Sequence, residues 1–408
     1  MSKSFIAASA VAITLAFSAV PVSLHAAEPP KLSDSTIKIL AAANDAMKAN
    51  RCPEAISKAR EALAVGDKPA YDTYLAHSII AACSQKLGNK ADLMKAFQGQ
   101  LDSGHPAPGE QNQIVKNMYG TAFELKDYAQ AVELGQRMIR SGAAAPETYD
   151  QVALAMIQQG KNAEAAKFLA EYIADLEKRG QKPREAPLLQ LRALQDKLGD
   201  SAGASATIEK LVRHYPKPDY WGHLTHSLAR DPKLNDRQKM QVYRLRVATG
   251  TLKLCRDYTE MADFAVNSSM AGEGQRVIEQ ALAAKVCKDK VDLDRMVRLQ
   301  GAAARFVAEE RAKLAKLEAD ARVAKTGEPD VQVGSSQFGF GEFAKSAEWL
   351  SRGVSKGGLK DVADAQLTLG IAYVRAGNRA EAMKTFSAIK TTDPNMQRIV
   401  KLWMLYAQ

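Results

Sequence analysis

Cysteine, histidine, proline and aromatic residues are all scarce in this chain of 408 residues. It contains 4 Cys, 6 His and 15 Pro, and 6% of its residues are aromatic. A low proline content is typical of a chain made mostly of helix. The apolar content of 46% is ordinary, which excludes disordered, collagen-like and low-complexity chains. Because a single hydrophobic core stops growing at roughly 250–300 residues, we do not expect one compact globule.

Long apolar segments are also lacking, except at the N-terminus. Residues 1–26 combine a positive charge at Lys3, an apolar stretch over 5–24, and the small residues Ala26 and Ala27 that signal peptidase requires. A retained membrane helix is the alternative, but it needs about 20 uninterrupted apolar residues, and Pro21 interrupts this stretch. The sequence therefore predicts a cleaved signal peptide and a mature periplasmic protein without a membrane span.

Motifs that carry catalysis or bind cofactors are lacking as well. The chain has no phosphate-binding Gly-Lys-Ser/Thr loop, no G-x-S-x-G elbow and no H-E-x-x-H helix. Residues 339–344 match the dinucleotide pattern G-x-G-x-x-A, but that motif needs a preceding strand, and a helical turn is expected here. His223 and His226 lie three residues apart, with His214 upstream, yet no acidic or cysteine cluster at ligand spacing accompanies them. We expect no catalytic residue, no cofactor and no bound metal.

A repeated helical hairpin is present, and its clearest copy lies near the C-terminus. Seven residues fall at positions 7, 8, 11, 15, 20, 24 and 32 of a 34-residue unit, namely Leu369, Gly370, Tyr373, Gly377, Ala382, Phe386 and Pro394. Leu369 and Tyr373 share one face of a first helix, Gly377 turns the chain, and the small Ala382 lets a second helix cross closely. This unit resembles the tetratricopeptide repeat family.

Further copies cover most of the mature chain. They are anchored on one residue of the second helix, which is Ala131, Ala165, Ala204 or Ser346 in the clearer copies and Ala55, Leu93 or Val277 in the weaker ones. The spacing implies about ten hairpins. One long helix without a turn is predicted over 289–325. The resemblance implies an all-α solenoid wound as a right-handed superhelix. We divide it into a signal peptide (1–26), N-terminal repeats (27–216), divergent repeats (217–325) and C-terminal repeats (326–408).

The four cysteines form two symmetric pairs. Cys52 and Cys83 are equidistant from the predicted turn at 66–69, and Cys255 and Cys287 are equidistant from Ala271, beside a predicted turn at 272–274. Residues equidistant from the turn of an antiparallel hairpin lie opposite each other. Because exported proteins favour disulfides, we predict bridges Cys52–Cys83 and Cys255–Cys287. The alternative is four buried free thiols.

Positive charge is concentrated in one segment. Residues 210–256 carry 11 Lys and Arg residues against three Asp, a surplus of +8 within the chain's net charge of +10. The candidate surface comprises Arg213, Arg237, Lys239, Arg244 and Arg246 together with Trp221 and Tyr243. Such a surface would suit an acidic protein or an anionic envelope polymer, whereas export argues against nucleic acid. The alternative is that the aromatic residues pack inside the hairpin and the cations are solvated.

The resemblance also implies a binding groove lined by the first helix of each repeat. At the positions that line this groove in the family stand Asp150, Gln151, Leu154, Ile157 and Gln158 in one repeat. In the C-terminal repeat Thr368, Ile371 and Arg375 stand at the corresponding places. Three functions are compared on this basis. The leading one is a periplasmic scaffold that binds a protein or peptide, within envelope assembly or TonB-linked transport. The others are a wall-associated factor that uses the basic segment, and an enzyme, which the missing motifs disfavour.

Overall fold

The computed structural model of the chain describes residues 32–267 and 270–408. The predicted signal peptide, residues 1–26, lies outside the described residues. Within these two ranges every regular element is a helix, and there are 20 of them, so the all-α prediction is confirmed. The helices fall into two compact units, an N-terminal unit over Met1–Gly199 and a C-terminal unit over Asp200–Gln408.

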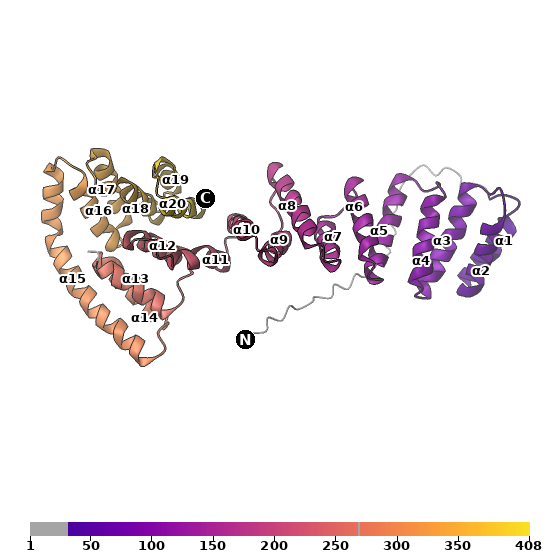
Figure 1. The fold of residues 1–408 in the computed structure, drawn as a ribbon, viewed down its shortest axis with the longest axis horizontal. Helices are drawn as coiled ribbons and strands as arrows, with labels where there is room; N and C mark the ends of the chain where they lie inside the picture. The colour runs from indigo at the N-terminus through magenta and orange to yellow at the C-terminus, as the bar shows by residue number, and fades with distance from the viewer. Residues whose placement is uncertain (1–31, 268–269) are drawn as a thin grey trace. The chain divides into compact units, whose positions relative to one another are not determined.

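The N-terminal unit is a series of helices, each packed against the next along the chain (Figure 1). Its helices are α1 (Ile37–Lys48), α2 (Cys52–Ala64), α3 (Ala70–Lys86), α4 (Lys90–Asp102), α5 (Pro108–Glu124), α6 (Tyr128–Arg140), α7 (Pro146–Gln158), α8 (Asn162–Lys178) and α9 (Glu185–Leu198). In addition α1 contacts α3, and α7 contacts α9. This is the stacking of helical hairpins that the repeat predicted, in which each repeat buries its apolar side against its neighbours.

The C-terminal unit contains the remaining helices. They are α10 (Ser201–His214), α11 (Pro218–Ala229), α12 (Asp236–Ala248), α13 (Cys255–Asn267), α14 (Ala271–Ala283), α15 (Lys290–Val323), α16 (Glu328–Gly339), α17 (Phe343–Lys356), α18 (Val362–Arg375), α19 (Arg379–Ala388) and α20 (Pro394–Ala407). Buried apolar side chains of α10–α12 and α16–α20 form one core, and those of α12–α15 form a second. Helix α12 belongs to both, so it is central to this unit.

The last helix, α20, returns to the helices that open the C-terminal unit. It contacts α10 and α12. Trp403 donates its indole N–H to the carbonyl of Gln241 at 3.2 Å, and Tyr406 donates its hydroxyl to the carbonyl of Ala248 at 3.1 Å. The observed boundary between the units, after Gly199, differs from the predicted boundary after residue 216, because α10 belongs to the second unit. The predicted boundary after residue 325 does not separate two units, because helices of 217–325 and 326–408 share a core.

The turns inside several hairpins follow one local rule, in which a residue with positive φ precedes an Asn or Asp N-cap. Gly88 (φ 70°) precedes Asn89, and Gly377 (φ 83°) precedes Asn378. Each Asn side chain accepts a hydrogen bond from the backbone N–H three residues later. Glycine adopts a left-handed backbone without a steric penalty, and the N-cap oxygen satisfies a free amide. Lys126 (φ 58°) holds the same place in the turn between α5 and α6, where no glycine marks it in the sequence.

Close crossing of the two helices in a hairpin depends on one small and one large residue. In the C-terminal repeat Gly370 of α18 faces Phe386 of α19, and a Cβ at Gly370 would lie 2.2 Å from the ring. In the repeat of α5 and α6 the sizes are exchanged, since Tyr119 stands at the position of Gly370 and Gly135 at that of Phe386. A Cβ at Gly135 would lie 2.9 Å from the Tyr119 ring. Each crossing thus combines one glycine with one aromatic side chain, but the helix that carries the glycine differs between the two repeats.

Two further predictions concern α14 and α15. The single long helix expected over 289–325 is confirmed as α15. The turn expected at 272–274 is wrong, because these residues form the first turn of α14. Gly272 has a packing role instead, since a Cβ there would lie 2.8 Å from the carbonyl carbon of Gly339 in α16. The pattern at 339–344 covers the end of α16 and the turn at Gly341 (φ 83°), so the expected helical turn is confirmed.

One of the two predicted disulfides is present. Cys255 and Cys287 are bonded, which connects the start of α13 to the segment that follows α14. Cys52 and Cys83 are buried free thiols, so the first predicted bridge is wrong as a covalent bond. The two thiols nevertheless lie next to each other, as the symmetric spacing predicted. Burial, followed by the hydrogen bond with the Cys52 thiol, raises the pKa of Cys83 to about 12.

Candidate functional site

The predicted groove residues of α7 are accessible within the N-terminal unit. Leu154 is 43% exposed. Gln158 is exposed, and Gln151 and Ile157 are half-buried. Their neighbours Val152, Ala153, Ala155 and Met156 are buried and hold the opposite side of α7 in the hairpin stack. The accessible side of α7 therefore combines two apolar side chains with two amides, and we call Gln151, Leu154, Ile157 and Gln158 the α7 strip.

Asp150, the fifth predicted groove residue of α7, belongs to an ion cluster. Arg184, the N-cap of α9, donates one guanidinium nitrogen to Asp150 and another to Glu147. The second carboxylate oxygen of Asp150 and the hydroxyl of Tyr119 are buried and have no hydrogen-bond partner among the described residues. Burial raises the pKa of Asp150 although Arg184 opposes the shift, and burial together with Asp150 raises the pKa of Tyr119. Asp150 thus positions α9 against α7.

The raised pKa of Asp150 predicts a pH dependence for the variant Asp150→Asn. An acid whose pKa is higher in the folded state stabilises the fold while protonated, and it loses that contribution as the pH rises through the folded pKa. The ordinary pKa is 3.8. The stability of Asp150→Asn relative to the wild type should therefore increase as the pH rises above 3.8 and then level off. Urea unfolding followed by far-UV circular dichroism measures it, with Glu147→Gln as the control for losing an Arg184 ion pair. A relative stability that falls with pH would contradict the assignment.

Two of the three predicted groove residues of α18, Thr368 and Ile371, are not available as a binding surface. Ile371 is 1% exposed and belongs to the core of the C-terminal unit. Thr368 is also buried and accepts a hydrogen bond from the Gln241 amide of α12 at 3.0 Å. Arg375 is exposed, and its guanidinium lies 4.7 Å from the Phe343 ring centre. This part of the groove prediction is wrong for Thr368 and Ile371, because Thr368 is bonded to Gln241 of α12 and Ile371 packs in the core of the unit.

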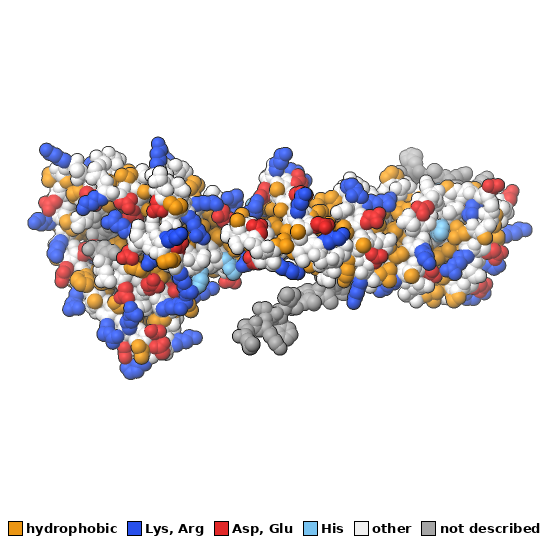
Figure 2. Space-filling view, viewed as in Figure 1, with side chains coloured by type: hydrophobic (Ala, Val, Ile, Leu, Met, Phe, Trp, Pro, Cys, Tyr) orange, Lys and Arg blue, Asp and Glu red, His pale blue; other side chains and the backbone are white. Residues whose placement is uncertain are grey.

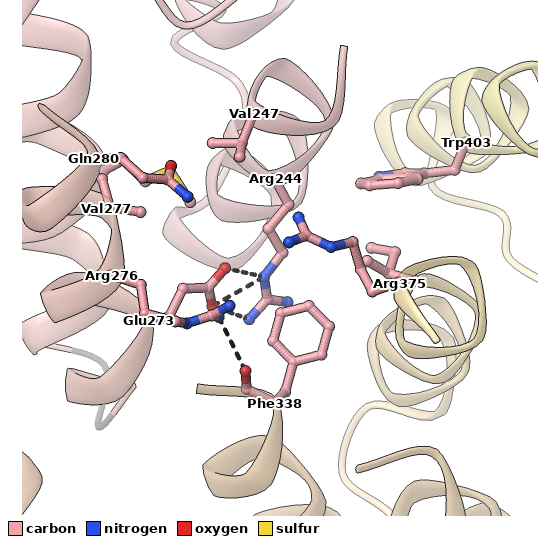
Figure 3. A pocket seen from close by; sticks show the side chains of 11 residues that line it. Arg244, Val247, Glu273, Arg276, Val277, Gln280, Phe338, Arg375 and Trp403 are labelled. Carbon is pink, nitrogen blue, oxygen red and sulfur yellow. Dashed lines mark hydrogen bonds and ion pairs between the residues drawn. The ribbon is translucent and has the colours of Figure 1, made fainter. Parts of the chain in front are cut away.

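A small pocket lies at this junction in the C-terminal unit. It is lined by side chains of α12, α13, α14, α16, α18 and α20, and it offers about 20 Å³ of space for a water-sized molecule. Figure 3 shows the side chains of Arg244, Glu273, Arg276 and Arg375 converging on it, with Phe338 beside them. The pocket therefore brings together four charged groups from three helices, one from each of α12 and α18 and two from α14, around the Phe338 ring of α16.

Arg244 and Glu273 form a buried ion pair in this pocket. Nε and Nη2 of Arg244 donate to the two carboxylate oxygens at 3.0 and 2.7 Å, and Nη1 donates to the Gln241 side chain. Both side chains are at most 5% exposed. The Arg244 guanidinium also lies 4.4 Å from the Phe338 ring centre. A two-pronged contact of this kind compensates the desolvation of both charges, and removing one partner would leave the other buried without compensation.

The predicted basic surface at 210–256 is wrong for its central members. Arg246 is buried and pairs with Asp257 at 2.6 Å, in addition to the buried pair of Arg244. Trp221 and Tyr243 are buried in the two cores, as the alternative proposed. Arg213 and Arg237 are exposed, and Lys239 is half-buried near the Phe264 ring. On the face shown in Figure 2, Lys and Arg side chains are interspersed with Asp and Glu. The charge surplus thus contributes two internal ion pairs and no continuous patch there.

Sequence reasoning missed Glu273, Arg276 and Asp257, which complete these interactions. Glu273 is 29 residues from Arg244 and on another helix, so no local pattern connects them. The one available signal was the pair of glycines on either side of Glu273. A Cβ at Gly272 would collide with Gly339, and a Cβ at Gly274 would lie only 3.0 Å from Val266, so this turn of α14 is tightly packed.

Two observations concern other classes of site. In the part of the chain that the structure describes, no group of three or more His, Cys, Asp or Glu side chains is arranged to hold a metal ion. None of the helices described combines the length and the apolar character that crossing a membrane requires.

Comparisons with known proteins identify the repeat. A family model described as "Tetratricopeptide repeat" matches residues 364–395, which include most of α18, all of α19 and the first two residues of α20. No curated protein matches the chain. Among solved structures, Naa15/Naa10 bound to HypK-THB is 14% identical with a TM-score of 0.29, and the match covers 90% of this chain and 64% of that one. The chain thus spans less than two thirds of the length of that protein.

Two further solved structures are similar to the chain. A tetratricopeptide repeat protein from Parabacteroides merdae is 11% identical with a TM-score of 0.28, and the match covers 91% of this chain and 100% of that one. Yeast Tom70 is 10% identical with a TM-score of 0.25, and the match covers 90% of this chain and 94% of that one. At these identities and scores no residue is transferred from them.

Proposed function

Residues 364–395 match the tetratricopeptide repeat family, and we propose from that premise that the chain is a tetratricopeptide repeat protein and a non-catalytic scaffold that binds a protein or peptide through its N-terminal unit. The observation that carries the proposal is the exposure of the α7 strip. Leu154 is 43% exposed at a place where the equivalent residue of the C-terminal repeat, Ile371, is 1% exposed. The same repeat position is therefore buried in the C-terminal repeat and exposed in the repeat of α7, where a partner can reach it.

The chemistry of the α7 strip indicates the kind of partner. Leu154 and Ile157 supply apolar area, whose burial contributes roughly 25 cal/mol per Å². Gln151 and Gln158 each supply an amide that both donates and accepts hydrogen bonds. An apolar anchor residue with free backbone amides and carbonyls around it matches this set. The partner that we propose is therefore a peptide segment or loop carrying an apolar side chain.

We place this scaffold in the periplasm, in envelope assembly or TonB-linked transport. The signal-like residues 1–26 support export, and the Cys255–Cys287 disulfide supports an oxidising compartment. N-terminal sequencing of the protein purified from its native cells tests the export part. A first residue at Ala27 or Glu28 is expected, whereas a chain that begins at residue 1 or 2 would contradict it.

Site-specific photo-crosslinking in intact cells tests the binding part. A photoreactive residue at Leu154 and, separately, at Gln158 should capture the same partner. Leu293 on α15 is the matched control, because it is a leucine of similar exposure, 40%, in the other unit. The proposal fails if Leu154 and Gln158 capture nothing, or if Leu293 captures the same partner with equal yield.

A further inference from the structure

The pocket of the C-terminal unit contains more positive than negative charge. Three arginines, Arg244, Arg276 and Arg375, converge on it with one carboxylate, Glu273. The carboxylate is occupied on both oxygens by Arg244. The charge of Glu273 therefore balances that of Arg244, and no carboxylate of the pocket is bonded to Arg276 or Arg375.

The hydrogen bonds of Arg276 and Arg375 do not supply that anion. Arg276 donates to the backbone carbonyls of Gly339 at 2.9 Å and Phe338 at 3.0 Å, which are neutral acceptors. Arg375 has no hydrogen bond or ion pair within the described residues, and in Figure 3 its side chain extends from α18 toward Arg244. The two guanidinium groups lie 5.2 and 4.7 Å from the centre of the same Phe343 ring.

The half-buried Arg276 and the exposed Arg375 carry like charges and repel each other, and the partial burial of Arg276 reduces the screening of this repulsion by water. The pKa of Arg276 is lowered by burial first; Glu273 and Glu279 oppose this shift, whereas Arg375 and Arg244 lower the pKa further. An anion that both groups reach would replace this repulsion by two charge-assisted hydrogen bonds.

The pocket is small but has room for one ion. The centre of a water-sized probe can move within about 20 Å³ of it. A single halide, which is close to a water molecule in size, therefore fits. We propose that the pocket binds one chloride-sized anion that both Arg276 and Arg375 reach, which ties α14 to α18. This site is independent of the α7 strip and of the scaffold function.

Thermal unfolding of the full chain in two salts tests the proposal. The protein is compared in sodium chloride and in sodium gluconate of equal ionic strength, since gluconate is too large for the pocket. Tryptophan fluorescence reports the C-terminal unit, because Trp221, Trp349 and Trp403 are the only tryptophans of the chain and all lie in it. Chloride should raise the midpoint of the wild type by about 2–4 °C, and the rise should saturate with concentration.

The variant Arg375→Gln separates a specific site from a general salt effect. In gluconate its midpoint should equal or exceed that of the wild type, because one of two repelling charges is gone, and its response to chloride should be lost. Arg379→Gln, an exposed arginine of the same unit, should respond like the wild type. The broadening of the chloride-35 NMR line by the wild type, absent with Arg375→Gln, gives a second readout that does not depend on stability. Equal chloride responses in the wild type and Arg375→Gln, or no response in either, would overturn the site.

Discussion

Replacing Glu273 with alanine should lower the free energy of unfolding of the C-terminal unit by about 3–5 kcal/mol. The reason is that Arg244, which is 5% exposed, would lose its carboxylate and remain buried beside the like charge of Arg276. Urea unfolding followed by tryptophan fluorescence measures this unit specifically, since all three tryptophans lie in it.

An exposed ion pair of the same unit provides the control for Glu273→Ala. Lys290 and Asp294 on α15 are paired at 2.9 Å, with side chains 86% and 49% exposed. Because solvent screens such pairs, Asp294→Ala should change the stability by less than about 1 kcal/mol. Replacing Arg244 and Glu273 together with methionine should recover much of the loss, since it removes both charges. A loss below about 1 kcal/mol for Glu273→Ala would show that the buried pair does not hold the helices as described.

Replacing Gly370 with alanine should destabilise the same unit by about 1–3 kcal/mol. The added Cβ would lie 2.2 Å from the Phe386 ring, and that ring is 1% exposed in the core and has little room to move. The double variant Gly370→Ala, Phe386→Leu should recover part of the loss, because the smaller side chain makes space for the new methyl group. The same tryptophan-detected unfolding measures both variants.

Gly301→Ala is the matched control for Gly370→Ala. Gly301 lies inside α15, is exposed, and has open space around the position of a Cβ. The same chemical change should there stabilise the helix by about 0.5–1 kcal/mol, because alanine is the better helix former. Opposite signs for the two glycines are expected, and equal effects would contradict the packing explanation.

The local structure of the repeats could be predicted from the sequence because it depends on residues close together in the chain. Gly377 and Pro394 mark a turn and a helix start through their own backbone preferences. No turn of the repeat can be placed over 289–325, and this correctly predicted the long helix α15. The repeat pattern does not predict the turn at Lys126 or the close helix crossing at Tyr119 and Gly135. In both places the residue types differ from those that the pattern requires, although the backbone turn and the crossing are the same.

The contacts between distant segments could not be predicted in the same way. The symmetric spacing correctly predicted the disulfide between Cys255 and Cys287, whereas the same argument placed Cys52 beside Cys83 but was wrong about a bond between them. No such relation connects α20 to α10 and α12, or Glu273 to Arg244. Counting charges over 210–256 therefore suggested a surface patch, although two of its arginines are neutralised by carboxylates outside the segment, Asp257 and Glu273.

The affinity of the chain for the protein captured at Leu154 tests the proposed scaffold function most directly. Isothermal titration should show that Leu154→Asp weakens binding by about tenfold or more, because a charge replaces an apolar anchor. Leu293→Asp, at a leucine of similar exposure on α15, should leave the affinity unchanged. Equal affinities for the wild type and both variants would contradict the proposal that the α7 strip is the binding surface.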